Sequence, residues 1–156
     1  MYEPREDSFL LQSVVKKYAK GKVLDMGTGS GIIADEVKKY TSDVLAVDID
    51  EECVKKSKEK AVVSDLFSNI KEKFDVIFFN PPYLPSEIKY PDLDAGKNCE
   101  VVNKFLEDAK NHLNKNGKII ILVSSLTKVD LSDYKNKIIA KKKLPFEELF
   151  VFELSL

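Results

Sequence analysis

The sequence predicts an α/β fold: a seven-stranded, mostly parallel sheet with helices on both faces and a C-terminal antiparallel hairpin. Short apolar runs typical of buried strands alternate with segments of helical spacing, a pattern typical of βαβ units with right-handed crossovers. The last two strand-like runs have only a turn at Pro145 between them, so they are expected to pair antiparallel. The 156 residues, 44% of them hydrophobic, suffice for one globular domain, which we expect to span residues 1–156.

The N-terminal half predicts three helices and three strands. Apolar residues recur at helical spacing over 8–18, with Asp7 or Ser8 as a plausible cap and Gly21 as the end of this helix. The strands that follow are predicted over 22–26, 43–47 and 61–64, and the helices over 32–40 and 51–60.

The C-terminal half begins with the run Phe74–Phe79, which is almost wholly apolar, as expected of a central parallel strand buried on both faces. A proline-bearing loop over 80–98, a helix over 99–113 and a turn at Asn116-Gly117 come next. The remaining predicted elements are a central strand over 118–123, a helix over 130–139 and the hairpin strands over 139–144 and 148–154.

The composition disfavours several classes of function. Lys and Arg total 25 and Asp and Glu total 26, so no global positive charge attracts nucleic acid or membranes. Arg5 is the only arginine, which disfavours sequence-specific nucleic-acid recognition, and the lysine run at 141–143 is read as a solvated strand end. Cys53, Cys99 and His112 form neither a disulfide framework nor a metal cluster. We expect no metal, no membrane span and a cytoplasmic location.

A glycine-rich motif, Asp-Met-Gly-Thr-Gly-Ser-Gly over 25–31, lies where the first strand runs into a helix. Glycines at such a turn allow a ligand to approach the backbone closely. A dinucleotide fingerprint would carry glycine or alanine where Ile32 stands, and the Gly-Lys-Ser/Thr of a phosphate-binding loop is absent. The motif therefore indicates a nucleoside ligand without a pyrophosphate, with a plain strand–helix turn as the alternative.

Acidic residues follow the next two strands. Asp48 ends the second strand and could accept hydrogen bonds from both hydroxyls of a ribose, whereas Asp50 is expected to cap the following helix. Asp65 and Leu66, after the third strand, could accept from an adenine amino group and pack against its ring; a surface turn is the alternative.

The motif Asn80-Pro81-Pro82-Tyr83 directly follows the central strand and points to the chemistry. Proline has no backbone N–H, so this segment offers the Asn80 side-chain carbonyl and backbone carbonyls as acceptors with few donors. Such a site suits an –NH₂ group, which donates two protons. Acceptors fixed for both N–H bonds would aim the nitrogen lone pair at an electrophile, and Tyr83 could stack on the planar group.

These four motifs, in this order, resemble the class-I S-adenosylmethionine-dependent methyltransferases with their Rossmann-like sheet. The Asn-Pro-Pro-Tyr motif is similar to that of the amino methyltransferases. The opening Tyr-Glu-Pro-Arg-Glu-Asp-Ser-Phe-Leu-Leu over 2–11 resembles the short eukaryotic and archaeal branch of the HemK-like release-factor glutamine methyltransferases. The resemblance covers nearly the whole chain, although the stretch over 94–100 matches only in part and the loop over 84–93 is shorter than in many relatives.

The resemblance implies S-adenosyl-L-methionine as the cofactor and assigns roles residue by residue. The implied cofactor-binding residues are Ser8, Asp25, Gly27, Thr28, Gly29, Gly31, Asp48, Asp65, Leu66 and Asn80, and the implied catalytic residues are Asn80, Pro81 and Tyr83.

The resemblance implies a class-1 translation release factor as substrate, methylated on the glutamine of its Gly-Gly-Gln motif. Alternatives are an adenine or guanine amine in RNA or DNA, a protein lysine, or cofactor binding without catalysis. Relatives in this branch pair with a small zinc-binding activator, and the expected outermost strand Ala61–Val63 offers an apolar edge for it.

Overall fold

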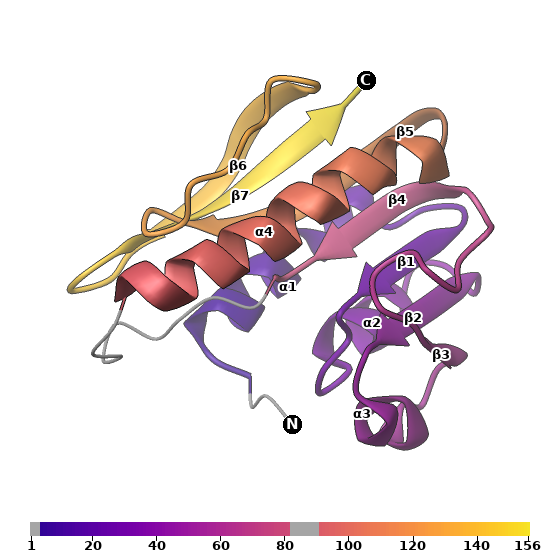
Figure 1. Cartoon of the computed structure of the whole chain (residues 1–156). Coiled ribbons are helices and arrows are strands. Elements are labelled where there is room, and N and C mark those ends of the chain that lie inside the picture. Colours follow the sequence, from indigo (N-terminus) through magenta and orange to yellow (C-terminus); the bar gives the residue numbers. More distant parts are fainter. Residues whose placement is uncertain (1–3, 82–90) are drawn as a thin grey trace.

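The computed structural model describes residues 4–81 and 91–156, with side chains described outside 91–99. Within that part of the chain, seven strands form one sheet in the order β3-β2-β1-β4-β5-β7-β6 (Figure 1). The strands are β1 (Val23–Met26), β2 (Val44–Asp48), β3 (Ala61–Val63), β4 (Phe74–Phe79), β5 (Leu113–Ser124), β6 (Lys135–Lys143) and β7 (Glu148–Ser155). The pairs from β3 to β5 are parallel, and β7 runs antiparallel to both its neighbours, so it is the reversed strand. The predicted fold class and hairpin are confirmed.

Helices cover both faces of this sheet. The helices are α1 (Glu6–Tyr18), α2 (Ile32–Val37), α3 (Glu51–Lys56) and α4 (Pro91–Ala109). One core joins α1 and α2 to alternate strand residues such as Val76 and Phe78, whereas the other joins α4 to Ile77 and Phe79. The central strand is therefore apolar from Val76 to Phe79 because successive side chains enter different cores.

The predicted loop over 80–98 is wrong from residue 91 onward, because α4 begins at Pro91. Proline is favoured in the first turn of a helix, where its missing N–H leaves no bond unmade. Gly96 and Asn98 have low helix propensity, so the local sequence disfavours a helix in a segment where the chain is helical. The chain then passes through a short 3₁₀ turn at Lys110–His112 into β5, which is longer than predicted.

The helix predicted over 130–139 is also wrong, because the chain forms a turn and then β6. Leu131, Tyr134 and Ile138 have helical spacing, but the Tyr134 hydroxyl instead donates to the backbone carbonyl of Leu106 in the core. The segment that follows pairs with β7 from Lys135↔Ser155 to Lys143↔Glu148. As an edge strand it is mostly exposed, so it lacks the alternation that marks a half-buried strand.

Two smaller predictions concern the ends of the sheet and the chain. Strand β3 is the outermost strand beside β2, as expected for Ala61–Val63. Neither Asp7 nor Ser8 caps α1, because Arg5 is the N-cap and both residues are buried in the first turn. Across residues 4–81 and 91–156, no helix has the length and apolar character needed to cross a membrane.

Candidate active site at the carboxyl edge of the sheet

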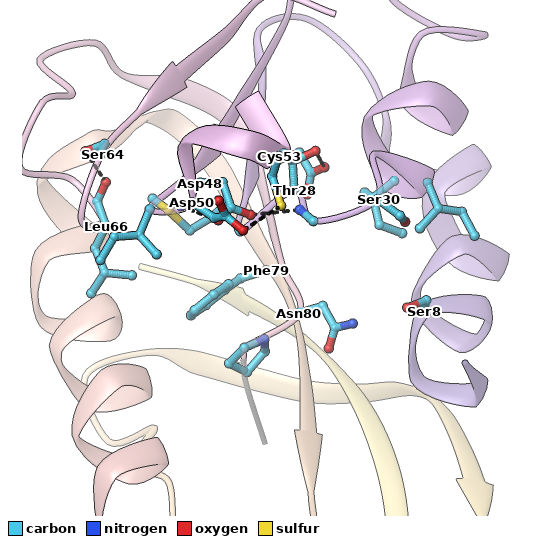
Figure 2. A pocket seen from close by; sticks show the side chains of 18 of the residues that line it. Ser8, Thr28, Ser30, Asp48, Asp50, Cys53, Ser64, Leu66, Phe79 and Asn80 are labelled. Carbon is cyan, nitrogen blue, oxygen red and sulfur yellow. Dashed lines mark hydrogen bonds between the residues drawn. The ribbon is translucent and has the colours of Figure 1, made fainter. Parts of the chain in front are cut away.

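A cavity of about 470 Å³ lies where the first four strands end, a volume typical of small-molecule sites (Figure 2). Its wall combines the first turn of α1, the ends of these strands with the loops that follow them, and residues of α2, α3 and α4. The lining residues are Asp7, Ser8, Asp25, Met26, Gly27, Thr28, Gly29, Ser30, Ile32, Ile33, Asp48, Ile49, Asp50, Cys53, Ser64, Asp65, Leu66, Phe79, Asn80, Pro81 and Val101. The wall thus brings together most of the described residues that the sequence singled out.

The glycine loop forms one side of the cavity with an unusual backbone. Gly27 and Gly29 have φ values of 68° and 52°, in the left-handed region that favours glycine. The backbone N–H of Thr28 donates to the Val47 carbonyl at 2.8 Å, so the loop is tied to the end of β2. Gly31 is absent from the wall of this cavity: with φ of 87° it is the N-cap of α2, a structural position.

Asp25 is the buried anchor of this loop, with a side chain only 2% exposed. Its Oδ2 accepts from the Thr28 hydroxyl at 2.7 Å and from the Ala34 backbone N–H at 3.2 Å. The carboxyl therefore joins the loop to α2. Burial raises the pKa of Asp25 from 3.8 to about 7, partly offset by these two hydrogen bonds.

Asp48 lies at the end of β2 with both carboxylate oxygens turned to backbone donors. Gly29 donates to Oδ2 at 2.8 Å and the Asp50 backbone donates to Oδ1 at 2.9 Å. Asp50 accepts from the Glu52 backbone N–H at 2.9 Å, so its predicted role as the cap of α3 is confirmed. A carboxylate oxygen accepts two hydrogen bonds, so Asp48 keeps capacity for hydroxyl donors.

The loop after β3 is shaped by the buried Ser64. Its hydroxyl donates to the Leu66 carbonyl at 2.7 Å and accepts from the Asn69 backbone at 2.9 Å. Leu66 has a backbone φ of 50°, in the left-handed region that residues other than glycine rarely adopt. Such strained backbone conformations occur often at binding sites. Asp65 is exposed, yet it lines the cavity together with Leu66.

Asn80 follows β4 and faces α1 across the cavity, on the side where Ser8 lies (Figure 2). Its amide Nδ2 donates to Asp7 Oδ2 at 3.1 Å, a contact between residues 73 positions apart. Its Oδ1 is buried and has no hydrogen-bond partner within the described residues. Buried polar atoms are normally paired, so an unpaired acceptor on a residue that lines the cavity indicates a donor supplied by a ligand.

The other predicted catalytic residues divide into two groups. Pro81 is buried and lines the cavity beside Asn80. Tyr83, and Pro82 of the same motif, lie outside the described residues.

Several lining residues were missed by sequence reasoning. Asp7 was considered only as a cap, although it is 1% exposed and pairs with Asn80. Ile49 is 68% exposed at the rim, and an isoleucine directly after Asp48 was the available signal. Cys53 has no predicted role in a ligand site, yet it lines the cavity; burial, together with the charges of Asp48 and Asp50, raises the pKa of its thiol.

Comparison with protein families gives one match along most of the chain. A model described as the methyltransferase small domain matches residues 6–139. A provisionally named protein N5-glutamine methyltransferase of Methanocaldococcus jannaschii is 40% identical, covering 97% of this chain and 89% of that protein.

Two bacterial relatives match this chain along only part of their own length. The ribosomal RNA small subunit methyltransferase C of Haemophilus influenzae is 32% identical over 74% of this chain and 36% of its own. The release factor glutamine methyltransferase of Lactococcus lactis is 35% identical over 64% of this chain and 46% of its own.

Solved structures share the fold. A chain of the E. cuniculi Mtq2–Trm112 complex, which is described as responsible for the methylation of the eRF1 translation termination factor, superposes with a TM-score of 0.77. It is 24% identical and covers 98% of this chain and 96% of its own. A Bacteroides fragilis S-adenosylmethionine-dependent methyltransferase in complex with S-adenosyl-L-homocysteine has a TM-score of 0.64 at 20% identity, covering 94% of this chain and 78% of its own. These structural likenesses concern the fold alone.

Proposed function

Because the chain belongs to the methyltransferase small domain family, we propose that it moves a methyl group from S-adenosyl-L-methionine to the side-chain amide nitrogen of a protein glutamine. The observation that carries this proposal is Asn80 Oδ1, a buried acceptor without a partner in the described part of the chain. The M. jannaschii relative, similar along almost its whole length, supports the glutamine.

The cavity fits the proposed cofactor. The glycine loop brings backbone close to the ligand, Asp48 has free acceptor capacity for ribose hydroxyls, and Ile49 and Leu66 offer apolar surface to an adenine ring. Asp65 at the rim would accept from the adenine amino group, and Ser8 would face the cofactor from α1. The bound cofactor would supply an electrophilic methyl carbon on a sulfonium.

The acceptor side of the site has to overcome the weak nucleophilicity of an amide nitrogen, whose lone pair is delocalised into the carbonyl. Asn80 Oδ1 and the Pro81 carbonyl would each accept one N–H of the substrate, which pulls the nitrogen toward a tetrahedral shape. The nitrogen lone pair would form the N–C bond as the C–S bond breaks with its electrons left on sulfur. The extra proton on nitrogen is then acidic and is released to water, so no strong general base is required.

A class-1 translation release factor is the substrate that we propose. The names of the L. lactis relative and of the E. cuniculi complex support it, since both refer to translation release or termination factors. The H. influenzae relative is named as a ribosomal RNA methyltransferase, so a nucleobase amine in RNA is the second candidate for the methyl acceptor. The net charge of −1 and the single arginine weaken that second candidate, because RNA binding depends on many phosphate contacts.

A partner protein completes the proposal. The exposed edge of β3, where Val63 is 39% exposed, would pair with a strand of a small zinc-binding activator. The two proteins named in the E. cuniculi complex support such a partner. Co-expression that turns an aggregating chain into an active soluble pair would support it, and a fully active isolated monomer would refute an obligate partner.

The function is tested by incubating the protein with tritium-labelled S-adenosyl-L-methionine, purified release factor and candidate activator, followed by mass spectrometry of tryptic peptides. We expect a single methyl group on the glutamine of Gly-Gly-Gln and no label on a Gly-Gly-Ala variant. Equal labelling of that variant would exclude this glutamine, and steep salt-dependent binding of RNA would favour the nucleobase. An Asn80→Ala variant with unchanged turnover would favour a different active site or a non-catalytic role.

A further inference from the structure

We propose that Asp7 is a positioning residue that holds the Asn80 amide in the one orientation able to grip an –NH₂ group. This inference rests on the proposed amide methylation and concerns the residue that prepares its acceptor.

An asparagine amide is nearly symmetric in shape, so its oxygen and nitrogen could exchange places by rotation about χ2. With nitrogen turned into the cavity, Asn80 would present donors to a substrate that has only donors to offer at this point. Something must therefore select the orientation that leaves the oxygen as the unpaired acceptor. The residues next to Asn80 do not make this selection, because Pro81 and Pro82 have no backbone N–H that could bind one end of the amide.

Asp7 supplies that selection through its chemistry. An ionised carboxylate accepts hydrogen bonds and cannot donate, so only the amide nitrogen of Asn80 can face it. The contact is 3.1 Å long, and the Asp7 side chain is 1% exposed, so competition from water is weak. Once Nδ2 is held by Asp7, Oδ1 is directed away from it as the buried, unpaired acceptor within the described residues.

The same contact strengthens the acceptor. A hydrogen bond from the amide nitrogen to an anion polarises the amide and increases negative charge on its oxygen, as in chains of cooperative hydrogen bonds. The N–H bonds of the substrate become more acidic as its nitrogen begins to form the new bond to carbon. An oxygen polarised by Asp7 would therefore bind the transition state more tightly than the ground state. Loss of this preference would lower kcat and leave KM nearly unchanged.

A charge exchange between the two positions tests the inference. Asp7→Asn leaves the amide orientation undetermined, and Asn80→Asp sets two carboxylates against each other. The double variant restores one amide donating to one carboxylate, with a free carboxylate oxygen at position 80. We expect each single variant to lower kcat by about 10–100-fold, the range of one hydrogen bond to a charged group, and the double variant to recover about tenfold over either.

Two controls separate positioning from a general loss of structure. Glu6→Gln removes a neighbouring exposed carboxylate that pairs with Lys142 outside the cavity, and its kcat should stay within about twofold of wild type. The affinity for S-adenosyl-L-homocysteine, measured by calorimetry, should change less than about threefold in the Asp7 variant. No recovery in the double variant, or unchanged kcat in Asp7→Asn, would overturn the inference.

A measurement on the wild-type protein without substrate distinguishes a failure of this inference from a failure of the proposed function. The Asn80 side-chain amide protons should exchange slowly with solvent in NMR, in contrast to those of the exposed Asn136. Fast exchange at Asn80 would refute the contact with Asp7. Slow exchange in a protein that methylates no amide would refute the proposed function while leaving the contact intact.

Discussion

The backbone N–H of Gly29 donates to the Asp48 carboxylate at 2.8 Å, so the glycine loop after β1 and the acid after β2 are fixed to each other. Asp48 thus accepts a hydrogen bond from the loop, and we propose that it also accepts hydrogen bonds from the ribose hydroxyls. The relation explains how a loop of glycines, which is intrinsically flexible, can form a defined wall.

Asp48→Ala should therefore weaken binding of S-adenosyl-L-homocysteine by about 10–100-fold, because it removes the proposed hydrogen bonds from the ribose hydroxyls and the hydrogen bond from Gly29 that fixes the loop. Isothermal titration calorimetry measures this change. The matched control is Asp43→Ala, an exposed carboxylate just before β2, which should bind within about twofold of wild type. Similar affinities for the two variants would show that Asp48 does not contact the ligand.

Gly31→Ala should lower the free energy of unfolding by about 1–2 kcal/mol, because Gly31 has φ of 87° and a side chain there is strained. An added Cβ would meet only the Asp35 carboxylate, at 3.9 Å, so crowding contributes little. Gly31→Asn should lose less, since asparagine tolerates the left-handed region better. Urea unfolding gives these values. Cofactor affinity lost tenfold or more at unchanged stability would instead make Gly31 a ligand contact.

Stability should depend on pH through Asp25, whose pKa burial raises from 3.8 to about 7. Between these values the folded chain retains a proton that the unfolded chain has released, so a rise in pH favours unfolding. Asp25→Asn cannot ionise and keeps an oxygen that accepts from Thr28. We expect the Tm of the variant minus that of wild type to increase from pH 4 to pH 7 and to level off above. A difference that stays constant over this range would contradict the raised pKa.

Tyr134→Phe should lower the free energy of unfolding by about 1–3 kcal/mol, because it leaves the Leu106 carbonyl without its donor inside the core. Burial raises the pKa of Tyr134 to about 12, which agrees with a hydroxyl that remains a donor across the accessible pH range. Tyr40→Phe, at an exposed tyrosine, is the control and should change stability by less than about 0.5 kcal/mol in urea unfolding. Equal losses in both variants would show that the Leu106 contact adds nothing.

The limits of the sequence prediction follow from which contacts are local. The central strand Phe74–Phe79 was predicted at its observed bounds, because burial on both faces leaves an almost wholly apolar run in the sequence. The strand Lys135–Lys143 was predicted in part as helix, because it is an exposed edge whose structure is decided by pairing with β7. The Asp50 cap was predicted because its partner, Glu52, is two residues away.

By itself the sequence determined that a glycine loop, acidic strand ends and Asn80 would gather at one edge of a sheet. The physical reason is that the carboxyl ends of parallel strands lie on the same side, so order along the chain becomes proximity in space. Only the tertiary structure decided that Asp7, on the first helix, would hold the Asn80 amide across 73 residues and leave its oxygen unpaired among the described residues. No local pattern encodes that contact, because it depends on how α1 packs against the completed sheet.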